Sequence, residues 1–149
     1  MDILSEPAFW YTFISIVSAF IICYISLGLR SSRKYLFRVF KANQKLSIAI
    51  QNSLAEFIKK HQADGAIALQ DTKITYGELL EQMQAEYKAN LSEELYLRLK
   101  KRRFSKVELT NAIDSLNKQN EALRFVDNNI KLVIRKVESW EKLQTYNKQ

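Results

Sequence analysis

The feature that most constrains this chain is an apolar segment near its N-terminus, Ala8 to Leu29, which reads AFWYTFISIVSAFIICYISLGL. It runs for 22 residues without a charged side chain. A helix of that length measures about 33 Å, close to the roughly 30 Å hydrocarbon core of a bilayer. The leader before it, MDILSEP, contains two acids and lacks the basic residues that begin a signal peptide. We therefore predict a short N-terminus and one transmembrane helix within residues 1–29.

The charges beside this segment predict its orientation. Two acids and no base precede it. The residues that follow include several basic side chains and no acid before Glu56. The basic residues are Arg30, Arg33, Lys34, Arg38, Lys41 and Lys45. Because positive charge stays on the cytoplasmic side, we expect the N-terminus outside and the rest of the chain in the cytoplasm, at the inner (plasma) membrane. Each of these side chains gains about 1 kcal/mol beside an anionic leaflet, and we assign them to the lipid bilayer.

One face of the apolar segment carries only small side chains. With Ala8, they fall in an arc of about 80° on a helical wheel. The predicted oligomerisation residues are Thr12, Ser15, Ala19, Cys23 and Ser26. Small residues let helices approach closely within a membrane, and Ser or Thr can hydrogen-bond across the contact. The stripe favours a homo-oligomer, although small residues are also tolerated in spanning helices without any such role. The number of copies, and whether they enclose a pore, stays open.

The rest of the chain predicts an all-α fold. Only three Gly and one Pro interrupt 149 residues. Apolar residues recur at helical spacing through 30–64, which predicts a basic juxtamembrane amphipathic helix that continues the anchor, with Gly65 as its stop. Residues 65–149 then form a cytoplasmic helical domain, a bundle or coiled coil. Residues 66–76 are expected to be a connector, with a small hairpin as the alternative.

Capping signals divide this domain into helices. Thr75 with Glu78 forms a capping box that opens a helix from residue 76 to about 89. Ser92 is placed to cap a helix from 93 to about 103. A second box, Ser105 with Glu108, opens a helix that runs to about residue 144.

The last helix has the clearest apolar periodicity in the chain. Its seam consists of Leu109, Ile113, Leu116, Leu123, Ile130, Ile134 and Val137. Asn120 and Asp127 interrupt the seam, and a buried Asn can fix the register and oligomeric state of a coiled coil. The alternative is a bundle helix that packs on residues 46–58 of the same chain.

A basic run, LRLKKRRFSK from Leu97 to Lys106, holds six of the chain's 23 basic residues and no acid. It falls where one predicted helix ends and the next begins, and a free helix N-terminus suits a phosphate. Arginine grips phosphate bidentately, and Phe104, with Tyr96 nearby, suits stacking on a base. The predicted ligand-binding residues are Arg98, Lys100, Lys101, Arg102, Arg103, Phe104 and Lys106. The alternatives are a solvated corner and a corner that folds back onto the inner leaflet.

Chemistry-bearing residues are scarce elsewhere. The chain has one Cys, Cys23, and one His, His61, which are too few for a disulfide or a zinc site. No phosphate-binding glycine loop and no Ser/His/Asp or Cys/His set is present. We therefore expect no metal, no cofactor and no enzymatic activity.

The spanning run AFWYTFISIVSAFIICYISLGL and the cluster LKKRRFSK together resemble the small membrane effectors of type III CRISPR antiviral defence. The resemblance implies a nucleotide-binding cytosolic domain that takes a cyclic oligoadenylate and acts at the membrane. The charge of the basic run adds short RNA as another possible polyanionic ligand. Two other hypotheses fit the same layout. The chain could be an anchored scaffold that recruits a partner protein through the helix from Leu109 to Val137. It could also be a holin-like toxin that needs only its anchor.

Overall fold

The computed structural model describes residues 7–69 and 73–146, with side chains at 18, 20, 21, 28–68 and 73–143. Its elements are α1 (Pro7–His61), β1 (Ile67–Leu69), β2 (Ile74–Thr75), α2 (Tyr76–Asn90), α3 (Glu93–Lys101) and α4 (Lys106–Tyr146). The chain is mostly helical, which confirms the all-α prediction at the level of fold class. The domain boundaries predicted at 29/30 and 64/65 stay predictions.

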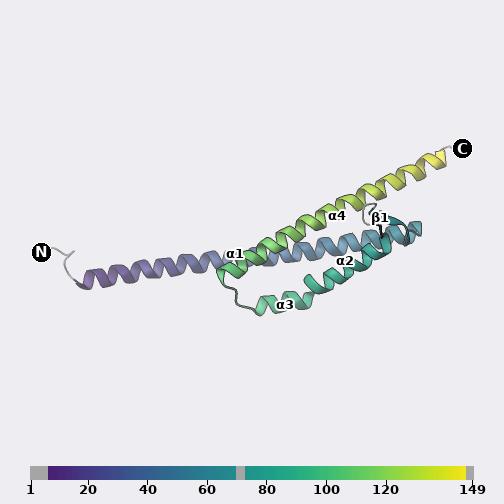
Figure 1. The fold of residues 1–149 in the computed structure, drawn as a ribbon. Coiled ribbons are helices and arrows are strands. Elements are labelled where there is room, and N and C mark those ends of the chain that lie inside the picture. Colours follow the sequence, from purple (N-terminus) through teal and green to yellow (C-terminus); the bar gives the residue numbers. More distant parts are fainter. Residues whose placement is uncertain (1–6, 70–72, 147–149) are drawn as a thin grey trace.

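The elements are arranged around α1, which forms the long axis of the molecule (Figure 1). From its end the chain turns through the β-hairpin and returns along α1 through α2 and α3. Helix α4 then runs in the same direction as α1, since Asn43 contacts Asn120 and Lys60 contacts Glu141. The 24 residues of α2 and α3 cover about 36 Å. That return brings the start of α4 back toward the N-terminal half of α1.

Helix α1 continues through Gly28 and ends at His61. Gln62 follows in the left-handed region, with φ of 50°, and the N–H of Ala63 bonds to the carbonyl of Ile58 at 3.1 Å. A left-handed residue followed by this backbone bond is the Schellman ending of a helix. Gly65 was expected to supply the left-handed stop, but Gln62 does so despite its side chain.

The predicted caps are present. Thr75 and Glu78 form a complete capping box at α2, and Ser92 caps α3 by accepting from the N–H of Leu95. At α4 the N–H of Ser105 donates to the Glu108 carboxylate at 2.9 Å, and the N–H of Glu108 donates to the Ser105 hydroxyl at 3.3 Å. The starts of α2, α3 and α4 were therefore predictable from the local sequence.

The segment between α1 and α2 is a small antiparallel hairpin. Ile67 pairs with Thr75 and Leu69 with Ile74, and Lys73 has a φ of 58°. The hairpin, which was the alternative to a plain connector, is what the structure contains. Because the pair is so short, it depends on packing against the helices.

A polar layer divides the buried interior into two parts. The distal core contains Ile50, Leu54, Phe57, Tyr76, Met83 and Ile130. The proximal core, nearer the apolar segment, contains Leu36, Phe40, Leu91 and Leu109, each at most 3% exposed. Between them lie Asn43, Gln44 and Ser47, also buried. Every described buried side-chain polar atom has a hydrogen-bond partner, so this layer is satisfied.

The seam of α4 packs against α1 of its own chain. Leu123, Ile134 and Val137 lie against the distal core, as the bundle alternative predicts. Asn120 donates to the side-chain oxygen of Asn43 at 2.6 Å, and Asn43 donates to the carbonyl of Leu116 at 2.8 Å. Asn120 thus fixes the register of α4 on α1 within one chain.

In the described residues, no helix contains a stretch long and apolar enough to cross a membrane. Most side chains of the predicted anchor, Ala8 to Leu29, lie outside that description. The side chains of Thr12, Ser15, Ala19, Cys23 and Ser26 lie outside it too, so the oligomerisation face stays a prediction.

Candidate anion-binding site

The basic run forms a corner between two helices, and residues 98–106 are called the basic corner below. Arg98, Lys100 and Lys101 occupy the last turn of α3, where positive charge is favourable against the helix dipole. Arg102 is the C-cap, and its N–H bonds to the carbonyls of Arg98 and Leu99 at 3.2 Å. These local interactions offset part of the repulsion among the like charges at this point of the chain.

One acid, Glu108, neutralises part of the corner. Its carboxylate accepts from Arg102 Nη2 at 2.6 Å and from the N–H of Ser105. The hydrogen bonds from Ser105, followed by the one from Arg102, hold the pKa of Glu108 below its usual value of 4.5. The carboxylate thus occupies the N-terminus of α4, which the sequence had suggested as a phosphate site. The neighbouring arginines are therefore more favourable partners for an anion than the N-terminus of α4.

The corner lies against α1, far away in sequence. Arg33 Nη2 donates to the carbonyl oxygen of Lys100 at 2.6 Å, a bond between residues 67 positions apart. Arg33 is also 5.7 Å from the ring centroid of Phe37. The basic corner therefore meets the first basic residues after the apolar segment, and the two clusters form one charged region.

A shallow cavity of about 240 Å³ opens where the two clusters meet. It is lined by Leu29, Arg30, Arg33, Arg103, Phe104 and Leu109. Three guanidinium side chains border it and no carboxylate does. None of these arginines forms an ion pair in the described part of the chain; Glu108, the acid next to the corner, pairs with Arg102. We call this the arginine cavity, and its charge favours a small anion.

The structure divides the predicted ligand residues among different surroundings. Arg103 and Phe104 line the arginine cavity, and Arg102 pairs with Glu108 and lies 5.5 Å from the Phe104 ring centroid. The remaining four side chains are exposed, at Arg98, Lys100, Lys101 and Lys106. Sequence reasoning missed Arg30 and Arg33 as part of this site, because it assigned them to the membrane surface alone.

Tyr96, which was expected to assist Phe104, packs elsewhere. Its ring centroid lies 5.4 Å from that of Phe37 and 5.6 Å from that of Phe40. Lys41 Nζ lies 4.1 Å from the Tyr96 ring centroid. The ring therefore belongs to the proximal core, and Phe104 is the aromatic side chain of the corner itself.

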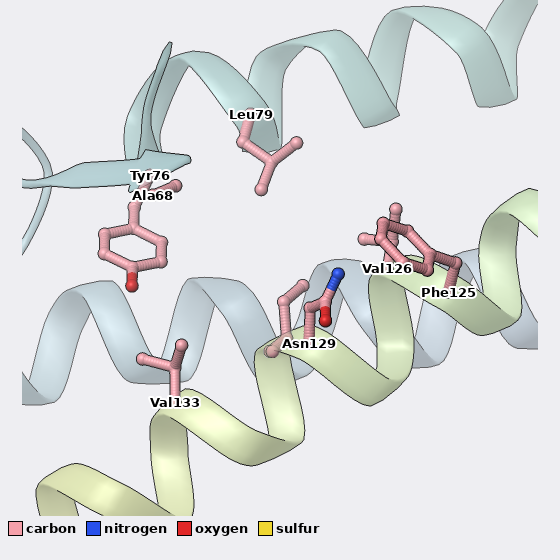
Figure 2. A pocket seen from close by; sticks show the side chains of 8 residues that line it. Ala68, Tyr76, Leu79, Phe125, Val126, Asn129 and Val133 are labelled. Atoms are coloured by element: carbon pink, nitrogen blue, oxygen red, sulfur yellow. The ribbon is translucent and has the colours of Figure 1, made fainter. Parts of the chain in front are cut away.

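Apolar cavities lie near the other end of the molecule. Figure 2 shows side chains of the hairpin, α2 and α4, among them Tyr76, Leu79 and Phe125, around a space of about 70 Å³. A groove of about 290 Å³ adjoins it between α2 and α4, sharing Leu79 and Val126 with the first. Burial raises the pKa of Tyr76 above 10.0, so its phenol is a neutral group here. These walls suit an apolar occupant and contain no set for catalysis.

Among residues 7–69 and 73–146, no group of three or more His, Cys, Asp or Glu side chains is placed to hold a metal ion. His61 instead contacts Glu141, with Nδ1 and Oε1 3.2 Å apart. Comparisons with protein-family models, with curated proteins and with solved structures find no match to this chain. The arginine cavity and the basic corner are therefore interpreted from their own chemistry.

Proposed function

We propose that this chain is a single-pass membrane protein whose basic corner binds a phosphate-bearing polyanion and transmits that binding to its anchor. The ligand class is an oligonucleotide or cyclic oligonucleotide messenger, and the response is a change in the membrane. The anchor is residues 8–29, and copies associate through its small-residue face. The observation that carries the proposal is the contact of the basic corner with Arg33, just beyond the anchor.

The charge distribution supports a polyanion as ligand. All six basic side chains of the corner are exposed, and one of them, Arg103, borders the adjoining cavity together with Arg30 and Arg33. Glu108 offsets only the charge of Arg102. Bringing this many cations together costs free energy, which a polyanion would recover. Phe104 provides a ring for one base, although the packing of Tyr96 into the core removes the second ring from such a role.

Helix α1 supports the second half of the proposal. It is continuous from residue 7 to residue 61, so the segment that contacts the corner and the predicted anchor belong to one helix. A ligand that draws the corner toward or away from Arg33 would therefore act directly on the base of the anchor.

The proposal can be tested with the full-length chain in nanodiscs, titrated with short single-stranded RNA and with cyclic oligoadenylates. The test variant is Lys100→Gln/Lys101→Gln/Lys106→Gln, which removes three exposed lysines of the corner. Each lost phosphate contact lowers the salt dependence of the affinity by about 0.7 in slope, so we expect a total decrease of about 2. The matched control is Lys118→Gln/Lys136→Gln/Lys142→Gln on α4, with the same charge change at exposed positions.

Equal weakening in both variants would mean that only net charge matters, and the absence of salt-sensitive binding would reject the corner as a ligand site. The membrane response is measured as dye release from liposomes that contain the full-length chain. Release that depends on the ligand supports a sensor. Release without any ligand, retained when the chain is truncated after Lys45, would instead indicate a toxin.

A scaffold remains the second candidate, and the outer face of α4 is what favours it. Phe125, Leu132, Trp140 and Leu143 are 53–67% exposed there. The seam from Leu109 to Val137 packs largely inward, so a partner protein would bind this outer face instead. Phe125→Ser/Trp140→Ser would then abolish partner capture without reducing the helix content, whereas the lysine variant of the basic corner would leave capture unchanged.

A further inference from the structure

We propose that the arginine cavity binds the phosphate of an anionic phospholipid headgroup, held jointly by Arg30, Arg33 and Arg103. This inference rests on the proposed anchor at residues 8–29, because the anchor brings the cavity to the membrane. It does not depend on whether the basic corner also binds the proposed messenger. It changes the role of the juxtamembrane arginines from diffuse contact with lipid to one defined site.

The first argument is charge. Three guanidinium groups border one cavity of about 240 Å³, its lining contains no carboxylate, and Glu108 of the same corner is paired with Arg102. A guanidinium binds phosphate through paired N–H donors, so a single phosphate can be shared by two or three arginines. One N–H group of Arg33 donates to the carbonyl of Lys100, and this hydrogen bond fixes the Arg33 side chain at the edge of the cavity. The site is therefore partly organised before a ligand arrives.

The second argument is location. Leu29, the last residue of the apolar segment, lines the same cavity as the arginines. Phe104 and Leu109 are the other apolar side chains of the same lining. Leu97 and Val107 flank the corner and are 49% and 69% exposed. Apolar side chains beside basic ones, at the end of a spanning segment, match the boundary between headgroups and acyl chains.

The third argument separates a lipid from an oligonucleotide. Base recognition needs open aromatic faces, and the corner offers only the Phe104 ring, because Tyr96 is packed among Phe37, Phe40 and Lys41. Arg102 already occupies one face of the Phe104 ring, 5.5 Å from its centroid. A lipid headgroup needs no stacking ring. The arginines also discriminate among lipids, because the ammonium of a zwitterionic choline headgroup would be repelled by three guanidinium groups.

The test uses the full-length chain in neutral detergent and counts bound ligands by native mass spectrometry. The probes are short-chain phosphatidylglycerol, short-chain phosphatidylcholine, glycerol 3-phosphate and a short oligoadenylate. The variant is Arg30→Gln/Arg103→Gln, which keeps the Arg33 bond to Lys100. We expect phosphatidylglycerol to bind more tightly than phosphatidylcholine, and the variant to lose about fivefold in affinity per arginine.

The matched control is Lys118→Gln/Arg135→Gln, with equal charge loss at exposed positions of α4 away from the cavity lining; its affinity for phosphatidylglycerol should be unchanged. Circular dichroism confirms that both variants are folded. Equal binding of both lipids, or an unchanged variant, overturns the site. Glycerol 3-phosphate binding as tightly as the lipid would assign the cavity to a free phosphate and overturn the lipid source.

Two outcomes keep this inference distinct from the proposed function. In the first outcome, oligoadenylate binds, phosphatidylglycerol does not, and the Arg30→Gln/Arg103→Gln variant no longer binds oligoadenylate. That result would overturn the inference and leave the messenger proposal intact. Phosphatidylglycerol that binds while no oligonucleotide does would support the cavity and reject the messenger. A chain recovered in the soluble fraction without detergent would reject the anchor and the lipid site together.

Discussion

The two ends of the α1–α4 pair are built differently. At the distal end, Ile50, Leu54 and Phe57 meet α2, the hairpin and α4 in one apolar cluster. At the proximal end, Leu36 and Phe40 are as fully buried, yet the surface around them carries the cations of α1 and of the basic corner. Burial of apolar area is the main stabilising term, whereas exposed ion pairs contribute little. The distal end therefore has the larger apolar cluster, whereas the proximal end, which the proposed function makes the binding end, combines a smaller core with a charged surface.

The largest effect that would test this division is a cavity in the distal core. Leu54→Ala removes a side chain that is 0% exposed, and we expect a loss of about 2–5 kcal/mol in the free energy of unfolding. The measurement is urea denaturation of the full-length chain in mild detergent, followed by circular dichroism. Ile48→Ala, at a position 42% exposed on the same helix, should cost under ~1 kcal/mol. Similar losses would mean that the distal cluster is not the stabilising core.

The polar layer between the two ends gives the next largest effect. Asn43→Leu leaves the amide of Asn120 and its neighbours without their buried partner, which costs about 1–3 kcal/mol. Asn43→Leu/Asn120→Leu removes both partners, so we expect it to be less destabilised than the sum of the single variants, measured in the same denaturation assay. Additive losses would show that the two amides do not act as a pair. A change in the oligomeric state of the double variant would show that the pair also specifies assembly.

The pH dependence of stability should originate at the proximal end. Hydrogen bonds from Ser105 and Arg102 lower the pKa of Glu108, and a bond from Lys41 lowers that of Glu93. A carboxyl with a lowered folded pKa stabilises the fold above its unfolded value of 4.5 and loses that contribution as the pH falls through the folded pKa. Glu108→Gln should therefore flatten the fall in stability below pH 4.5, measured by urea denaturation. Glu138→Gln, on the exposed distal half of α4, serves as the control and should leave the slope intact.

The smallest effect is expected at an ion pair within α4. Lys131 and Asp127 are 2.6 Å apart, one helical turn from each other, with Lys131 55% exposed. Lys131→Ala should change the free energy of unfolding by no more than about 0.5 kcal/mol. A loss above 1 kcal/mol in the denaturation assay would contradict the view that apolar burial, and not exposed charge, stabilises the distal end.

Local features of this fold were predictable and long-range ones were not. Thr75, Ser92 and Ser105 marked the helix starts because a cap is a contact between residues three apart. The pairing of Asn120 with Asn43 depends on how far α2 and α3 carry the chain back, which no local pattern encodes. The same holds for the bond from Arg33 to Lys100. The sequence therefore predicted the residues of the basic corner as a site. It identified Arg30 and Arg33 on α1 only as charges next to the predicted anchor.

Because α1 is continuous, one helix joins the arginine cavity to the proposed anchor, and the rotational positions of the two about the helix axis are linked. Each residue of an α-helix turns the chain by about 100°, so the face of the anchor is phased to the face that carries Arg33. One residue inserted between Gly28 and Arg33 would turn the anchor by about 100° relative to the corner. Seven inserted residues would nearly restore the original angle while lengthening the helix by about 10 Å. Under the proposed function, a rotation of α1 imposed at the corner would turn the anchor in the membrane by the same angle.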